Sequence, residues 1–306
     1  MRARAGAFAL CFALGCASQK QAATVDLASE FLSTACRAPA GPEFGDAWLA
    51  YEDRHQAFYD AIYYGSADAK AERKQLAAEL GPRRDEMCGH ARVFLMVAPE
   101  MVAAMRARVA GLVGTAPEAQ VYFSAALQWT DGRREAFEGR EVLVLNARHD
   151  TFARTSGLAA TVAHELLHDA QTRANHGADE QLPPLARSLY REGFAVFAVQ
   201  QLFPELKDRA IGLKPEQLEA AQVAAPAAAT ELLRLLHTPD AGPNQRRFFQ
   251  GGVVDEKFPP KMGYYLGDRV FQAIAAQRGV ATAIRIGPAE LLERAEAELT
   301  RISTQR

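Results

Sequence analysis

This chain has few cysteines and tryptophans, and its net charge is close to zero. Its 306 residues include 4 Cys and 2 Trp, and 35 Lys and Arg nearly balance 37 Asp and Glu, which leaves a net charge of −2. Because there is no basic excess and no acidic tail, neither nucleic-acid binding nor a solvating role is expected. Hydrophobic residues make up 49% and charged residues 24%, as in an ordinary globular protein. The length allows one or two domains.

The N-terminus carries a short apolar run instead of a membrane span. Arg2 and Arg4 precede the run Ala5–Leu14, which has about half of the ~20 residues that a spanning helix needs. A basic start followed by a short apolar run is typical of a secretory signal peptide. We therefore expect residues 1–15 to be removed from the mature protein.

The end of this run resembles a bacterial lipobox. Gly15 directly precedes Cys16 in the sequence Ala13-Leu14-Gly15-Cys16. The resemblance implies cleavage before Cys16 and attachment to a membrane through lipid on that cysteine. Because Ala17 and Ser18 carry no acidic retention signal, we expect an outer-membrane protein of the bacterial cell envelope that faces the periplasm. The alternative is a plain secretory leader, cut near Ala17, that releases a secreted protein.

Cleavage leaves two cysteines in the mature chain, Cys36 and Cys88. An even number of cysteines in an oxidising compartment favours a disulfide. The bond would close a loop of about 53 residues and stabilise the fold by roughly 4 kcal/mol in the chain-entropy description. Two free, buried thiols are the alternative.

Hydrophobic periodicity divides the rest of the chain into three parts. Residues 16–45 mix polar residues with prolines and glycines and are expected to form a tether. Residues 46–113 have helical periodicity and are expected to form an N-terminal helical region. Residues 114–306 combine strand and helix patterns and carry the chemistry described below.

The expected fold is α+β and predominantly helical. Strands are predicted at 121–124 and 141–146, with a polar loop at 130–140 between them. Residues 93–97 fit a helix or a strand, and an irregular loop with four prolines is predicted over 238–261. Helices are predicted over residues 46–62, 67–80, 99–114, 155–173, 185–203, 215–237, 262–278 and 288–303.

One short stretch carries recognisable chemistry. His164-Glu165-Leu166-Leu167-His168 is an HExxH motif within a predicted helix. Histidines four residues apart lie one turn apart on one helix face, so both imidazoles can reach a single Zn²⁺ at ~2.0–2.1 Å. Glu165 points about 100° around the helix, where its carboxylate can take a proton from a zinc-activated water. With 7 histidines in the chain, this pattern is rarely expected by chance.

A third metal ligand is needed, and Glu192 is the best candidate. It heads an otherwise apolar run, so its carboxylate needs a partner if it is buried, and a metal is a strong one. It follows His168 by 24 residues, which suits a second helix that returns antiparallel past the first. Asp179 in the intervening loop is the runner-up, and His149 and His176 are weaker alternatives.

The combination resembles a known family. HExxH followed by a downstream Glu192-Gly193-Phe194-Ala195 resembles the gluzincin metallopeptidases, and Gly263-Tyr264-Tyr265-Leu266-Gly267 is similar to the G-Y-x-L-G motif of a bacterial group of predicted zinc-dependent proteases. This resemblance covers roughly residues 115–280. It implies a zincin-like metallopeptidase domain, expected over 114–306, with a small sheet packed on the HExxH helix.

The same resemblance implies the roles of the site residues. It implies that zinc is bound by His164, His168 and Glu192, and that Glu165 is the general base. Gluzincins often supply a phenol that donates to the developing oxyanion, and Tyr264 is the candidate here. An aromatic core pair of Tyr264 with its neighbour is the alternative, and either tyrosine of the pair could be the donor.

Two functions remain open from the sequence. The first is a membrane-tethered zinc metallopeptidase acting on a peptide or protein. The second is a non-catalytic envelope lipoprotein with a structural zinc, for which a base at Glu165 would have no use. In the first case the strand predicted at 141–146 could pair with an extended substrate if it lies at a sheet edge, whereas an interior strand would have no such role.

Overall fold

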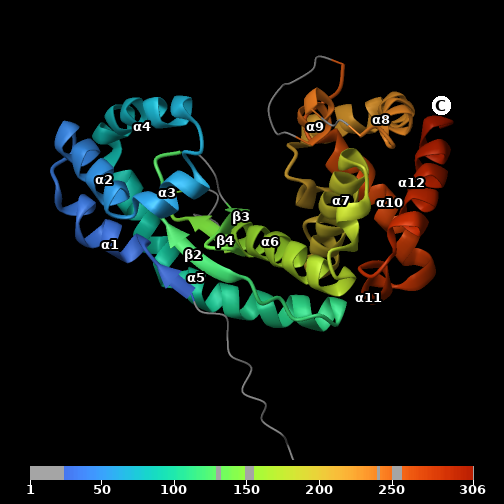
Figure 1. The fold of residues 1–306 in the computed structure, drawn as a ribbon, viewed down its shortest axis with the longest axis horizontal. Coiled ribbons are helices and arrows are strands. Elements are labelled where there is room, and N and C mark those ends of the chain that lie inside the picture. Colours follow the sequence, from blue (N-terminus) through green and yellow to red (C-terminus); the bar gives the residue numbers. More distant parts are fainter. Residues whose placement is uncertain (1–23, 129–131, 149–154, 240–241, 250–256, 306) are drawn as a thin grey trace, which may run out of the picture.

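The computed structural model describes residues 24–128, 132–148, 155–239, 242–249 and 257–305 (Figure 1). The expected signal peptide and Cys16 lie outside these residues. Within them, the fold is α+β and predominantly helical, as expected, with one small mixed sheet. α6 runs between the sheet with its surrounding helices α1–α5 and the group α7–α12 (Figure 1). No helix of the described ranges combines the length and the apolar composition that crossing a membrane requires.

Regular secondary structure begins inside the segment 16–45, which the sequence predicted to be a tether. Residues 24–45 contain the strand β1 (Thr24–Asp26), the helix α1 (Ala28–Ser33), the 3-10 helix η1 (Ala35–Arg37) and the start of α2 (Pro42–Arg54). The tether prediction is therefore wrong for this part. Phe31 and Phe44 explain why, because both rings are fully buried against Trp48 and so hold the segment to the core.

The N-terminal helices largely follow the predicted pattern. The apolar stretch predicted as one helix is broken at His55 into α2 and α3 (Gln56–Ile62), and α4 (Ala67–Leu80) begins where Ser66 accepts a hydrogen bond from the amide of Ala69. After η2 (Gly81–Arg83), a single helix α5 (Arg84–Val113) continues through Pro99, so the prediction that Pro99 begins a helix is wrong. Buried residues on both sides of Pro99, such as Phe94 and Val102, pack both halves of the helix on the core.

Cys36 and Cys88 form the expected disulfide, with their Cα atoms 5.9 Å apart. The bond joins η1 to the second turn of α5. It therefore fixes the N-terminal segment to the longest helix of the fold.

The sheet has four strands in the order β1-β2-β4-β3. β2 (Gln120–Ser124) and β4 (Arg140–Asn146) confirm the two predicted strands, and they are parallel to each other and to β1. The predicted polar loop at 130–140 is wrong, because β3 (Gly132–Phe137) pairs antiparallel with β4. Glu138 and Gly139 both have positive φ and form the tight hairpin turn between these strands.

This order changes which strand could meet a ligand. β4 lies between β2 and β3, so the strand predicted as a possible edge is interior. β3 occupies the edge instead. Its polar, half-buried residues hid it from the sequence pattern, because a strand exposed along one side carries no continuous apolar run.

Helices cover both faces of the sheet. Phe94 of α5 packs on Phe123 of β2, whereas Phe58 of α3 stacks on the neighbouring Tyr122 on the opposite face. α6 (Thr155–Asn175) packs against α5 and against β3. The small sheet therefore rests on the HExxH helix, as the sequence predicted.

The remaining helices follow α6 in close succession. The expected irregular loop over 238–261 is wrong in part, since residues 242–249 form a helix that ends in the buried Phe248 and Phe249. The helices that follow α6 in the described residues are η4 (Ala178–Gln181), α7 (Pro184–Leu202), η5 (Lys207–Ile211), α8 (Pro215–Leu235), α9 (Gly242–Phe249), α10 (Met262–Arg278), α11 (Val280–Ala283) and α12 (Pro288–Ser303).

Candidate metal centre

α6 presents two histidines toward α7. His164 and His168 lie one helical turn apart, with their Nε2 atoms 3.1 Å from each other and their rings nearly perpendicular, at 89°. Both are mostly buried, with 19% and 9% of their side chains exposed. The pair predicted from the motif is therefore formed, and both imidazoles turn the same nitrogen to one point.

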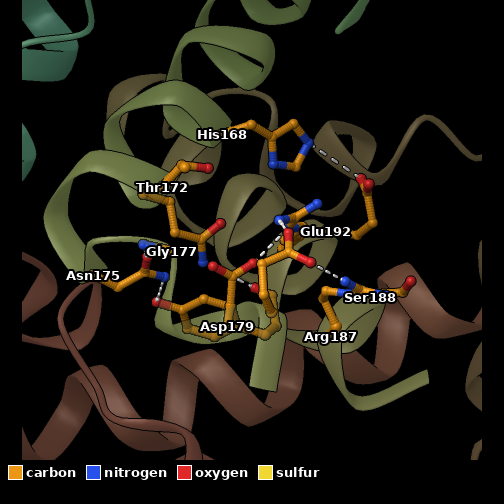
Figure 2. A network of polar contacts seen from close by, with 12 residues as sticks. His168, Thr172, Asn175, Gly177, Asp179, Arg187, Ser188 and Glu192 are labelled. Carbon is orange, nitrogen blue, oxygen red and sulfur yellow. Dashed lines mark hydrogen bonds and ion pairs between the residues drawn. The ribbon is translucent and has the colours of Figure 1, made fainter. Parts of the chain in front are cut away.

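Glu192 of α7 supplies the third group at this point. Its Oε2 atom lies 3.2 Å from Nε2 of His164. The same atom lies 3.5 Å from Nε2 of His168, and Figure 2 shows the Glu192 and His168 side chains turned toward each other. Glu192 is 23% exposed, so the cluster opens toward solvent on one side. In the described part of the chain, these three residues form the cluster of His, Cys, Asp and Glu that could hold a metal ion.

The surroundings of Glu192 and His164 shift the pKa of each. Burial by itself would raise the pKa of the Glu192 carboxyl, but His168 and His164 outweigh burial and hold that pKa well below its usual range. Burial would likewise lower the pKa of His164, but its hydrogen bond to Glu192 and the charges of Glu192 and Glu165 leave that pKa raised. The Glu192 carboxylate is therefore ionised at neutral pH and can serve as a ligand to a cation.

The turn of α7 that carries Glu192 is held on the α6 side through Tyr190. Gln171 donates a hydrogen bond to the carbonyl oxygen of Tyr190 at 3.2 Å, and Asn175 donates to its hydroxyl at 3.0 Å. The Tyr190 hydroxyl in turn donates to the carbonyl oxygen of Ile284 at 2.9 Å. These bonds fix the residue two positions before Glu192 against α6.

Asp179 holds the same turn from the other side. Its Oδ2 atom accepts a hydrogen bond from Nε of Arg191 at 2.6 Å, while Glu180 accepts from the same guanidinium at 2.7 Å. The Asp179 side chain is 2% exposed. The runner-up ligand thus lies outside the cluster and binds the residue next to Glu192 (Figure 2).

The other two alternative ligands do not join the cluster. His176 is exposed after the end of α6, in a left-handed backbone conformation with φ 55°. His149 lies outside the described residues.

The helix that carries the histidines is also fixed by a residue next to His168. Asp169 accepts hydrogen bonds from the amides of Glu118 and Ala119 at 2.5 Å and 3.1 Å, just before β2. This buried carboxylate ties α6 to the entry of the sheet. The position of His168 along the sheet is therefore set by its neighbour.

Glu165 lies beside the edge strand. A Cβ atom at Gly132, the first residue of β3, would lie 3.4 Å from Cγ of Glu165 and 2.9 Å from Cγ2 of Thr161. Because 2.9 Å is too short for a real contact, either Thr161 or β3 would have to move to admit a side chain at position 132. Gly132 therefore lets the sheet edge approach the carboxylate predicted to be the base.

Tyr264 and Tyr265 of the G-Y-x-L-G motif face different surroundings. The Tyr264 ring stacks on His164, with centroids 6.4 Å apart and planes 22° apart. Tyr265 is 7% exposed, packs under the guanidinium of Arg269 and lines a cavity of about 560 Å³ between α8, α10 and α12. Of the two, Tyr264 is the tyrosine beside the cluster.

Two glycines bring α10 against the glutamate helix. A Cβ atom at Gly267 would lie 2.7 Å from Cα of Gly193, and one at Gly193 would lie 2.5 Å from the backbone of Gly267. The helices α7 and α10 therefore cross in backbone contact next to Glu192. Gly193 and Gly267 thus permit this close approach, whereas Gly263 makes room for the Phe249 ring.

Sequence reasoning missed the residues that surround the cluster without belonging to a motif. Gly132 was assigned to a loop, and Asp179 was considered as a ligand when it in fact binds Arg191. The sequence signal that could have placed Gly132 in a strand is the Glu138-Gly139 turn, which is typical of a hairpin between two short strands. No sequence signal identifies the Asp179–Arg191 pair, because it depends on how η4 packs on α7.

Comparisons of the chain with family models, with curated protein sequences and with solved structures find no match.

Proposed function

We propose that this protein is a zinc metallopeptidase that hydrolyses peptide bonds at the cluster of His164, His168 and Glu192. The observation that carries the proposal is the convergence of these three groups from two helices, with an ionisable carboxylate, Glu165, on the same helix turn as the histidines. This arrangement agrees with the gluzincin resemblance of the sequence, which remains part of the proposal.

The donor set fits zinc. Two imidazole nitrogens and one carboxylate oxygen are ordinary zinc ligands, and around a tetrahedral ion with bonds of ~2.0–2.1 Å such atoms lie about 3.3–3.4 Å apart. The three separations here are 3.1, 3.2 and 3.5 Å. Three ligands with partial exposure are typical of a catalytic site, since structural zinc sites are closed by a fourth protein ligand.

When bound, zinc supplies a Lewis acid that polarises the substrate carbonyl and acidifies a water. Glu165 accepts the proton of the attacking water and passes it to the nitrogen of the leaving amine. Tyr264, next to His164, is suited to donate its hydroxyl hydrogen to the oxyanion that develops on the carbonyl.

The edge strand β3 is the proposed binding surface for the peptide. Its outer side has no neighbouring strand in the described sheet, and its first residue, Gly132, adjoins Glu165. An extended peptide that added to β3 would receive main-chain hydrogen bonds and pass the proposed base. This surface replaces the interior strand β4, which the sequence had suggested.

The alternative is a non-catalytic protein with a structural zinc. Metal analysis of the purified protein, together with cleavage of a broad peptide library, tests the proposal against it. We expect one zinc per chain, lost in His164→Ala and His168→Ala and weakened in Glu192→Ala, together with peptide cleavage. A zinc-loaded protein that cleaves nothing would favour the structural role, and full zinc occupancy in Glu192→Ala would refute the ligand set.

Membrane attachment through Cys16 remains a proposal from the sequence. Detergent phase separation tests it, because a lipidated protein enters the detergent phase and Cys16→Ser does not. A wild-type protein that stays in the aqueous phase would contradict it.

A further inference from the structure

Lys261, the residue before α10, brings a positive charge near the candidate metal centre. Its Nζ atom lies 5.6 Å from the centre of the Tyr264 ring, and this ring stacks on His164 at 6.4 Å. The ammonium group therefore lies within the length of about three to four extended residues, at roughly 3.3 Å each, from the proposed zinc ligand. That is the reach of a peptide bound across the site.

The backbone around this ammonium group is unusual. Lys261 has φ 57°, in the left-handed region that residues other than glycine, asparagine and aspartate seldom adopt. A Cβ atom at Gly212, which also has positive φ, would lie 2.7 Å from Nζ of Lys261. The position of the ammonium group thus depends on the strained backbone of Lys261 and on Gly212, which leaves room for Nζ.

No carboxylate of the described ranges forms an ion pair with Lys261, whose side chain is half-buried. The arginines of the edge strand do have such partners, as Arg133 pairs with Glu135 and Arg134 with Glu141. A half-buried ammonium group that no described carboxylate pairs is suited to bind an anion, because a charge-assisted hydrogen bond then replaces lost hydration.

We infer that Lys261 binds a carboxylate of the peptide substrate and makes the enzyme selective for it. This inference rests on the proposed peptidase function. The carboxylate can be the C-terminus of the peptide or the side chain of an aspartate or glutamate within a few residues of the cleaved bond. Both present the same group to Nζ, so the experiment must separate them.

Matched peptides provide the first test. One pair differs only in a free or an amidated C-terminus, and a second pair, with the C-terminus amidated, differs only in glutamate or glutamine near the cleaved bond. We expect kcat/KM of the wild type to favour the acid in at least one pair by roughly tenfold to hundredfold, the effect of one charge-assisted hydrogen bond. The pair that responds identifies the source of the carboxylate.

Lys261→Asn removes the charge and keeps a residue that tolerates the left-handed backbone. The acid-to-neutral ratio of kcat/KM should fall to near one in this variant. Lys214→Asn is the matched control, because Lys214 is an exposed lysine that likewise precedes a helix, α8, and the ratio should stay at the wild-type value there. Zinc content and circular dichroism verify that both variants are folded.

Peptide binding gives a readout that does not need turnover. In a Glu165→Gln background, fluorescence anisotropy should show tighter binding of the acid than of the neutral peptide, and Lys261→Asn should abolish the difference. A wild type that cleaves both members of each pair equally would overturn the inference and leave the peptidase proposal standing. A wild type that cleaves no peptide would refute the peptidase, and equal binding of the paired peptides would then also overturn the role of Lys261.

Discussion

The carboxylate of Glu192 lies 3.2 Å from Nε2 of His164, although the two residues are 28 positions apart in the chain. Neither residue is positioned by the other alone. His164 is fixed on α6, which the sheet and Asp169 hold, and Glu192 is fixed on α7, which crosses α10 in backbone contact. The metal centre therefore depends on the packing of three helices, and changes in this packing should alter metal binding.

Asp179 should influence zinc affinity without touching the metal. It holds Arg191, and Arg191 precedes Glu192. We expect Asp179→Asn to weaken zinc binding by about 10- to 100-fold, as for other residues that orient a ligand, with the fold retained. Competition with a chromophoric chelator measures the affinity.

The matched control for this prediction is Glu180→Gln. Glu180 binds the same arginine, but 59% of its side chain is exposed, so its contribution should be small. Equal zinc affinity in Asp179→Asn and the wild type would show that Arg191 does not position the ligand.

Gly267→Ala should destabilise the protein. Its methyl group would lie 2.7 Å from Cα of Gly193 and 2.9 Å from the carbonyl oxygen of Leu189, so α7 and α10 must separate. We expect the free energy of unfolding to fall by about 3 kcal/mol, with a loss of zinc affinity as Glu192 moves. Urea denaturation and zinc titration measure the two effects.

Gly111→Ala is the control for this crossing. Gly111 is a helical residue of α5, and a Cβ atom there would meet nothing within 4 Å. This variant should be more stable than the wild type by roughly 0.5–1 kcal/mol, because alanine loses less conformational entropy in a helix. If Gly267→Ala behaved in the same way, close helix contact would not be a requirement of the fold.

The pH dependence of stability should report on Glu52, far from the metal centre. Burial raises the pKa of Glu52 from 4.5 to about 6, although the amide of Leu127 and Arg73 partly counteract it. The folded carboxyl of Glu52 binds its proton more tightly than the unfolded one, so protonation stabilises the folded state. This contribution to the free energy of unfolding is fully present below pH 4.5 and is lost as pH rises through 6. The loss amounts to about 2 kcal/mol at 1.36 kcal/mol per pKa unit.

Urea denaturation between pH 4 and 7.5 tests this sign. The free energy of unfolding of the wild type, relative to Glu52→Gln, should decline across this window. Glu43→Gln, which changes an exposed glutamate of the same helix, should follow the wild type in parallel. Parallel curves for Glu52→Gln and the wild type would contradict the assigned pKa.

Local patterns predicted much of this fold. Helical periodicity located α4 and α10 to the residue, and the HExxH spacing identified the histidine pair, because both depend on neighbours within one or two turns. Glu192 could be predicted because an acid at the head of an apolar run needs a partner.

The failures share a physical cause. The strand β3 is polar, the segment 24–45 is ordered by rings that pack on distant residues, and Pro99 lies within a helix held by its core face. Each depends on contacts with residues outside its own helix or strand, which periodicity does not record. The Asp179–Arg191 pair and the position of Lys261 beside Gly212 also depend on contacts between separate elements.

The most direct test of the proposed mechanism is the kcat of Glu165→Gln, measured with zinc content on the same preparation. The substitution keeps the shape of the side chain and removes the base. We predict one zinc per chain and an unchanged fold, with kcat lower than that of the wild type by ~10² or more, the loss expected for a positioned general base. Wild-type turnover in the zinc-loaded variant would contradict the role of Glu165.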